Sequence, residues 1–350
     1  MGNFLLGHAL YYHVTSSGRD KEGHRLSNRR ITRRQFLASA AGAASAGLLA
    51  SATRSSWAEE PPEATVVRVR RPDVFAGGDI PQDVVTDMVH AAVGSLAGRD
   101  DPAAAWATFV KPDDVVGIKI NCLFGSGAST HPEVVNAIIA GCRAAGVPDD
   151  HIIVWDRTSA DLAKAGYPIN RDGPGVKFYG TDGDYEEQPT HIGVFRGRVS
   201  NILTRTITAL INVPILKTHS LSGVTMSLKN HYGSFHNPGD FHDGNCDPAM
   251  SDINSIPAIR EKTQLIVADA LFPIAEGGPQ ARPAFTWPYG AILAATDTVA
   301  VDYVGLQILE ERRRELGLPP IGRAARHIAT AAARGLGTND PARIRLLELA

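Results

Sequence analysis

The chain has 350 residues, of which 43% are apolar and 21% are charged, which is typical of a globular protein with one large domain or two modest ones. Its formal net charge is −2, so it lacks the basic excess that a broad nucleic-acid-binding surface requires. We therefore expect a small-molecule ligand or other proteins as partners, and no nucleic acid.

The first 58 residues resemble a twin-arginine (Tat) export signal with an N-terminal extension. The pair Arg33-Arg34 precedes a mildly apolar run from Phe36 to Ala50, and small residues follow at 56–58. That run of fifteen residues is shorter than the roughly twenty that a membrane-spanning helix needs. We predict the twin-arginine translocase as a partner during export, a periplasmic location, and no stable membrane anchor after cleavage.

Export changes the charge and the redox environment of the remaining chain. Removing the eight basic and two acidic residues of 1–58 from the totals of 35 and 37 leaves 27 and 35, a net charge of −8. Cys122, Cys142 and Cys246 include no CxxC pair, so the chain has no local zinc-ribbon or iron–sulfur cluster motif. An oxidising compartment permits one disulfide and leaves one thiol over, and the sequence does not fix which.

The predicted elements begin after a proline-rich entry segment at 59–80. Residues 83–96 have apolar positions at helical spacing. A buried strand at 115–120, a glycine-containing loop, a helix that begins with the capping box Thr130–Glu133, and a second strand at 151–156 follow. This order predicts a Rossmann-like βαβ unit over residues 115–156.

The later half of the chain continues the alternation of strands and helices. Strands are predicted at 209–213, 265–268 and 291–294, helices at 298–315 and 321–335, and a short helix after 339–341. We therefore predict an α/β fold with a mostly parallel sheet flanked by helices, and a single domain over 59–350.

The loop from Gly125 to Thr130 lies between a predicted strand and a predicted helix start. Free backbone N–H groups and the helix dipole favour an anion there. Thr130 stands where the third glycine of a dinucleotide fingerprint belongs, so nicotinamide or flavin binding has weak support. Asp156 ends the next strand, where a ribose-binding acid could lie. A plain connecting loop is the alternative.

The segment from Pro214 to His242 holds four of the twelve histidines. Lys217 and His219 follow a predicted strand, which places them at the carboxyl edge where open α/β sheets bind ligands. Residues 223–231 fit a short helix or an extended turn, and the glycine- and proline-containing segment beyond them fits no regular element. The predicted metal ligands are His219 and His231, and with less support His236 and His242. Their spacing matches no standard zinc or iron pattern, and surface loop histidines are the alternative.

Two lysines of this segment have several chemical roles open to them. Lys217 and Lys229 could bind phosphate or carboxylate, act as Schiff-base nucleophiles, or lie on the solvated surface, since burial decides among these. No G-x-S-x-G elbow is present, which argues against a serine hydrolase. Asp297 is predicted to cap the helix at 298–315, and Asp302 inside that helix needs a partner, water or a site.

Several of these motifs together resemble the family called domain of unknown function 362. They are Pro214-x-x-Lys217-Thr218-His219, Thr225-x-x-x-Lys229-Asn230-x-x-Gly233, Lys119-Ile120-Asn121 with Thr130-x-Pro132, Asp269 with Glu276-Gly277-Gly278-Pro279, and Thr296–Asp302. The resemblance covers about residues 110–310. Many relatives carry a ferredoxin-like cluster motif, which this chain lacks.

A fainter resemblance runs to the nickel-pincer lactate racemases. It implies that Lys217 or Lys229 contacts a cofactor, and that His219 or His231 is a ligand or proton carrier. The cofactor itself is unknown, with a transition metal as one candidate.

These observations predict a polar site at the carboxyl ends of the strands. Its expected catalytic residues are Lys217, His219 and Lys229, and its expected ligand-binding residues are Asn121, Thr130, Thr225, Asn230, Asp269 and Asp302. One hypothesis is a metal- or cofactor-dependent enzyme of redox or isomerase type. The alternative is a non-catalytic periplasmic binding or accessory protein for a small anionic ligand.

Overall fold

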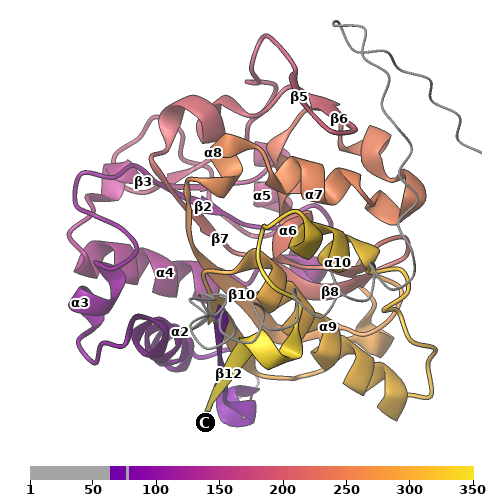
Figure 1. Ribbon diagram of the computed structural model, residues 1–350. Coiled ribbons are helices and arrows are strands. Elements are labelled where there is room, and N and C mark those ends of the chain that lie inside the picture. Colours follow the sequence, from indigo (N-terminus) through magenta and orange to yellow (C-terminus); the bar gives the residue numbers. More distant parts are fainter. Residues whose placement is uncertain (1–63, 76–78) are drawn as a thin grey trace, which may run out of the picture. The chain divides into compact units, whose positions relative to one another are not determined.

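The computed structural model describes residues 64–75 and 79–350, and a sheet of ten strands runs through them (Figure 1). These residues belong to one structural unit, Pro61–Ala350. The predicted signal peptide at 1–58 lies outside the described residues. Within the described ranges, no helix is both long enough and apolar enough to span a membrane.

The sheet is mixed and mostly parallel. Its order is β12 (Ile344–Leu349), β1 (Ala64–Arg70), β11 (Ala291–Ala295), β10 (Thr263–Ile274), β7 (Ala209–Asn212), β2 (Val116–Lys119), β3 (Ile152–Trp155) and β4 (Lys177–Phe178), while β8 (Ile215–His219) pairs with β10 and with β9 (Gly223–Thr225). Only β11 and β9 run antiparallel to their neighbours in this sheet. A separate hairpin joins β5 (Thr190–Ile192) and β6 (Phe195–Gly197).

Helices cover both faces of the sheet because its strands are apolar on both sides. In β11, Ile292 and Ala294 belong to one hydrophobic core, and Leu293 and Ala295 to the other. The first core is covered by α2 (Gln82–Ala97), α3 (Pro102–Trp106), α4 (Pro132–Ala144) and α5 (Ser159–Lys164). The second is covered by α6 (Ser227–Asn230), α7 (Ala249–Asn254), α8 (Pro257–Arg260), α9 (Thr298–Glu315) and α10 (Arg326–Ala333) (Figure 1). The predicted α/β fold is confirmed.

The predicted βαβ unit is present as β2, α4 and β3, but the helix starts one residue later than the capping box implies. His131 is the N-cap of α4, and no side chain caps it. The Thr130 hydroxyl instead accepts a hydrogen bond from the Asn121 backbone N–H at 3.1 Å and donates to the Val213 carbonyl at 2.9 Å. Thr130 therefore ties the loop after β2 to the chain after β7.

Other differences lie near the carboxyl terminus and in the segment after β8. The helix predicted at 321–335 is the shorter α10, and the one predicted after 339–341 is a single turn, Pro341–Arg343, followed by β12. Residues 344–349 form a strand because β1 offers them a parallel edge. Residues 223–231 contain both a strand, β9, and a short helix, α6.

The three cysteines are unpaired and buried. No disulfide joins Cys122, Cys142 and Cys246, and burial raises the pKa of the Cys142 thiol to about 12. At this pKa the Cys142 thiol is protonated at neutral pH and is a poor nucleophile.

Candidate functional site

The site forms where the sheet divides along the 12-residue strand β10. The first part of β10 pairs with β7 and the later part with β8, and Val213 and Pro214 separate these two partners. Since β2, β3, β7, β8 and β10 are mutually parallel, their carboxyl ends meet at the same edge. A cavity of about 300 Å³ lies there.

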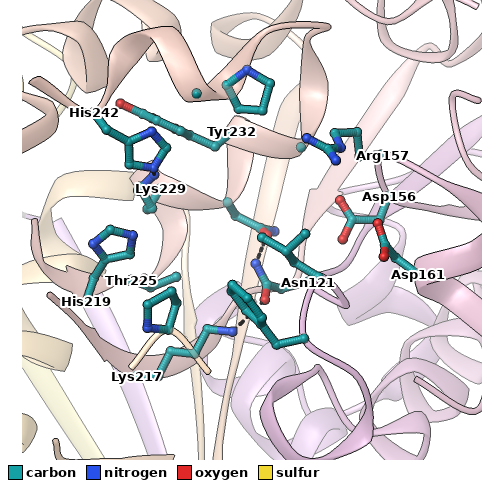
Figure 2. Close-up of a pocket in the computed structure, with 17 residues that line it drawn as sticks. Asn121, Asp156, Arg157, Asp161, Lys217, His219, Thr225, Lys229, Tyr232 and His242 are labelled. Atoms are coloured by element: carbon teal, nitrogen blue, oxygen red, sulfur yellow. Dashed lines mark hydrogen bonds between the residues drawn. The ribbon is translucent and has the colours of Figure 1, made fainter. Parts of the chain in front are cut away.

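Two walls of different character face this cavity. Figure 2 shows Lys217, His219, Lys229 and His242 on one side, with Arg157, Asp156 and Asp161 across from them. The remaining lining residues are Asn121, Leu123, Phe124, Thr225, Asn230, Tyr232, Gly233, Pro238, Gly239 and Pro279. Cationic, acidic and apolar groups therefore surround the same small volume.

Lys217 projects from β8 and is only 1% exposed. Its Nζ donates to Asn121 Oδ1 at 2.9 Å and to the Ala128 carbonyl at 2.6 Å. Among the described residues it forms no ion pair. Burial lowers the pKa of Lys217 to about 7, although the Asp156 carboxylate acts in the opposite direction. The neutral and charged forms of this amine are therefore both populated near neutral pH.

Lys229 is carried by α6 and faces the cavity from the same side. Its Nζ lies 3.1 Å from the centroid of the Tyr232 ring and 3.2 Å from His242 Nε2. It too has no ion-pair partner in the part of the chain that the structure describes. Burial lowers the pKa of Lys229 to about 7, and the charge of Lys217 adds to this effect.

His219 is a neutral hydrogen-bond donor. Its Nδ1 accepts hydrogen bonds from the backbone N–H groups of Leu221 and Ser222, at 3.2 and 3.3 Å, so Nε2 carries the proton. Burial, and then the Lys229 charge, lower the pKa of His219 to about 3. The ring stacks with that of His242, with 5.8 Å between centroids.

Thr225 lines the cavity, and its hydroxyl has no hydrogen-bond partner among the described residues. The residue is 3% exposed. Thr225 lies directly opposite Lys217 in the antiparallel pair of β8 and β9. Because a buried hydroxyl without a partner costs about 1–3 kcal/mol, this group destabilises the fold unless a further atom bonds to it.

A network of amide side chains fixes the position of α6. Asn230 donates to the Lys119 carbonyl at 3.1 Å and to Asn212 Oδ1 at 2.7 Å, and its own Oδ1 accepts from Asn121 at 3.3 Å. From the other side, Asn254 of α7 donates to the Leu228 carbonyl at 2.8 Å. These bonds connect α6 to β2, β7 and α7.

A buried ion pair supports the floor of the site. Lys119 Nζ lies 2.7 Å from Asp156 Oδ1, and Asp156 Oδ2 accepts from the Cys122 backbone N–H at 2.8 Å. Gly233 packs against this pair so closely that a Cβ there would overlap the Asp156 carboxylate. Asp156 is thus neutralised within the protein, an arrangement that differs from the free ribose-binding acid considered from sequence.

Three of the predicted ligand-binding residues do not line the cavity, and Thr130 is one of them. Asp302 accepts from the backbone N–H groups of Ser227 and Leu228, at 2.7 and 3.2 Å, and so caps α6. Burial raises the pKa of Asp302 to about 8. Asp269 accepts from the backbone N–H and Nδ1 of His131, at 2.8 and 2.7 Å. These carboxylates position the elements that carry the site.

The four predicted metal ligands do not come together. His219 and His242 line the cavity, whereas His231 is buried beside Ser234, with 3.2 Å between Nδ1 and Oγ. His236 lies in a separate surface hollow, where its Nδ1 accepts from the Arg198 backbone N–H at 2.9 Å. In residues 64–75 and 79–350, no group of three or more His, Cys, Asp or Glu side chains is placed to hold a metal.

The charge of the neighbouring groups also opposes a metal ion between His219 and His242. Lys229 Nζ lies within hydrogen-bond distance of His242 Nε2. The charged form of Lys229 would repel a cation placed there. The structure brings only His219 and His242 to this cavity, so the predicted pair of His219 and His231 does not face one common site.

Sequence reasoning missed several lining residues, above all Arg157 and Tyr232. Arg157 lies two residues after the end of β3, so the carboxyl-edge rule that selected Lys217 also applied to it. Tyr232 lies between two motif positions, and its ring supports Lys229. The turn that contributes Pro238 and Gly239 has no sequence signal that would place it over this cavity.

Fold and site together define an α/β protein with a small pocket at the carboxyl edge of its sheet, lined by lysine, arginine, histidine, aspartate and apolar side chains. The family model described as "Domain of unknown function (DUF362)" matches residues 116–307, and the chain belongs to this family. The match includes most of the elements that build the pocket, from β2 to α9.

Two further comparisons add little detail. No curated protein matches the chain. Among solved structures, a Thermotoga maritima protein from the Northeast Structural Genomics Consortium is 10% identical, with a TM-score of 0.33. The similarity covers 73% of this chain and 59% of that one, so the chain spans less than two thirds of its length.

Proposed function

We propose that this pocket binds a small organic anion and that Lys217, His219 and Lys229 move protons on it. The observation that carries the proposal is the pair of buried lysines that face one cavity without a carboxylate partner in the described part of the chain. An anion between them would raise both lowered lysine pKa values and offset the cost of burying the two charges.

The rest of the lining supports an organic rather than an inorganic anion. Arg157 adds a guanidinium on the opposite wall, while Leu123, Phe124 and Pro279 supply apolar surface for a carbon skeleton. The volume of about 300 Å³ is at the lower end of the usual range for ligand pockets, which favours a small molecule.

The protonation states favour an enzyme over a simple binding protein. An amine whose pKa is about 7, such as that of Lys217, is suited both to accept and to donate a proton at neutral pH. His219 Nε2–H is a fixed donor to a ligand oxygen. A binding protein for anions would be served better by permanently charged groups.

Replacing Lys229 by glutamine is expected to weaken binding of small carboxylates by about ten- to a hundredfold, the effect of losing one charged hydrogen bond. Binding is measured by calorimetry and by thermal shift with acetate, lactate, succinate, citrate and inorganic phosphate. Lys111→Gln, which removes an exposed lysine away from the pocket, is the matched control and should bind as the parent does. The proposal is wrong if none of these anions binds, or if the two variants lose affinity equally.

We also propose that the chain is exported by the twin-arginine pathway to the periplasm. The support is the Arg33-Arg34 pair before the apolar run. Changing both arginines to lysine is expected to retain the precursor in the cytoplasm, measured by fractionation and immunoblotting. The neighbouring pair Arg29-Arg30 offers a matched control, and its double lysine variant should be exported normally. Equal export of both variants would exclude this route.

A further inference from the structure

Two hydrogen bonds hold the Lys217 nitrogen at the wall of the cavity. A neutral amine has two N–H groups, and two acceptors, Asn121 Oδ1 and the Ala128 carbonyl, bind this nitrogen. With both hydrogens directed to these acceptors, the lone pair of the neutral amine is not used by either bond. Lys217 lines the cavity and its nitrogen lies beside Asn121 (Figure 2).

The neighbouring hydroxyl is suited to a ligand oxygen. Residues directly opposite each other in an antiparallel pair have Cβ atoms about 4.5–5.5 Å apart, so the Thr225 hydroxyl lies close to the Lys217 side chain. This hydroxyl is buried and has no hydrogen-bond partner among the described residues. Rotation of the Thr225 side chain toward the cavity would let the hydroxyl donate to a ligand carbonyl oxygen.

The second lysine is placed differently and is a better electrostatic partner than a nucleophile. Lys229 Nζ packs against the face of Tyr232 at 3.1 Å from the ring centroid, a contact that favours the ammonium form. Lys229 can therefore bind a carboxylate while Lys217 reacts. The apolar side chains of Leu123 and Phe124 accommodate the carbon chain between these groups.

We propose that the pocket takes small α-keto acids and that Lys217 forms an iminium bond with the keto carbon. The proposal rests on the anion-binding function given above and names its substrate class. It combines three features of the cavity lining: the Lys217 amine, the unpartnered hydroxyl of Thr225 on the neighbouring strand, and the Lys229 amine as a cation for the carboxylate.

The reaction balances without an oxidant or reductant. The Lys217 lone pair attacks the keto carbon, a C–N bond forms, and the carbonyl π electrons move to oxygen, which takes a proton. The resulting carbinolamine loses its oxygen as water and becomes an iminium ion. Overall, one ammonium group and one carbonyl group give one protonated iminium and one water. Such an iminium acidifies the adjacent C–H bonds of the ligand and so prepares a proton transfer.

The test is reductive trapping. The full-length protein is incubated near pH 7.5 with pyruvate or 2-oxoglutarate and cyanoborohydride, and the modified lysine is identified by peptide mass spectrometry. The expected result is a reduced adduct on Lys217 that exceeds the modification of any surface lysine at least about tenfold. Lys217→Arg should abolish the adduct, whereas Lys111→Gln should retain it. Mapping on the parent protein gives the answer even where a Lys217 variant folds poorly.

The outcomes separate this proposal from the anion-binding function. If lactate or succinate binds but neither keto acid modifies Lys217, iminium formation is wrong and anion binding stands. If neither binding nor an adduct is found, both are wrong. Modification spread evenly over surface lysines, or directed to Lys229, also overturns the assignment to Lys217.

Discussion

Gly233→Ala is expected to lower the free energy of unfolding by about 3–5 kcal/mol, the range for disrupting a buried ion pair. A Cβ at this position would overlap Asp156 Oδ1 and would lie 2.8 Å from Lys119 Nζ. Both charges are buried, so neither can move into water to make room. Equilibrium unfolding in urea, followed by circular dichroism, measures the change.

Gly239→Ala provides the matched control because Gly239 lines the same cavity, yet a Cβ there would meet nothing within 4 Å. Its stability is expected to stay within about 0.5 kcal/mol of the parent. If the two substitutions destabilise the protein equally, overlap with the Lys119–Asp156 pair is not the reason why position 233 needs glycine.

Lys217→Met is expected to change the pH dependence of stability. The pKa of Lys217 is about 7 in the folded protein, against the ordinary lysine value of 10.5 expected in the unfolded chain, so between these values the unfolded chain binds more protons. Lys217 therefore makes the stability of the parent rise with pH over that window. Methionine cannot bind a proton, so the free energy of unfolding of Lys217→Met should exceed that of the parent by most below pH 7. This difference should decrease toward pH 10.5, by up to about 5 kcal/mol.

Urea unfolding of both proteins between pH 6 and about pH 10 tests this expectation. Lys111→Met, at an exposed position, should differ from the parent by a constant amount over the same range. A pH-independent difference for Lys217→Met would mean that the Lys217 pKa is not lowered by burial. Because the charges of Lys217 and Lys229 interact, the pH range over which stability changes reflects the titration of both lysines.

The fold could be predicted largely because its signals are local. Runs such as 265–268 and 291–294 are apolar on both faces, as strands buried between two helix layers must be, and Asp297 marks the start of α9 through its hydrogen bonds to Val299 and Ala300. The strand β12 was missed because its pattern of alternating burial is weak and its strand state depends on pairing with β1, some 280 residues away.

The candidate site was predictable in part for the same reason. Lys217 and His219 come soon after the strand predicted at 209–213 and lie in β8 of the structure, and Lys229 and Asn230 follow within the same motif-rich segment. Sequence position alone therefore placed these four residues near one another. The roles of Asp269 and Asp302 depend on partners 138 and 75 residues away. Both carboxylates looked like ligand groups in the sequence, because nothing local shows that backbone N–H groups already use them.

At four residues the helix α6 is too short to be stable alone, and hydrogen bonds from other elements position it: Asp302 on α9, Asn254 on α7, and Asn212 and Lys119 on the sheet. The position of the Lys229 amine at the cavity therefore depends on residues spread over most of the family region. If the cavity binds the proposed anion, we expect substitutions at these distant residues to change the binding affinity without contacting the anion.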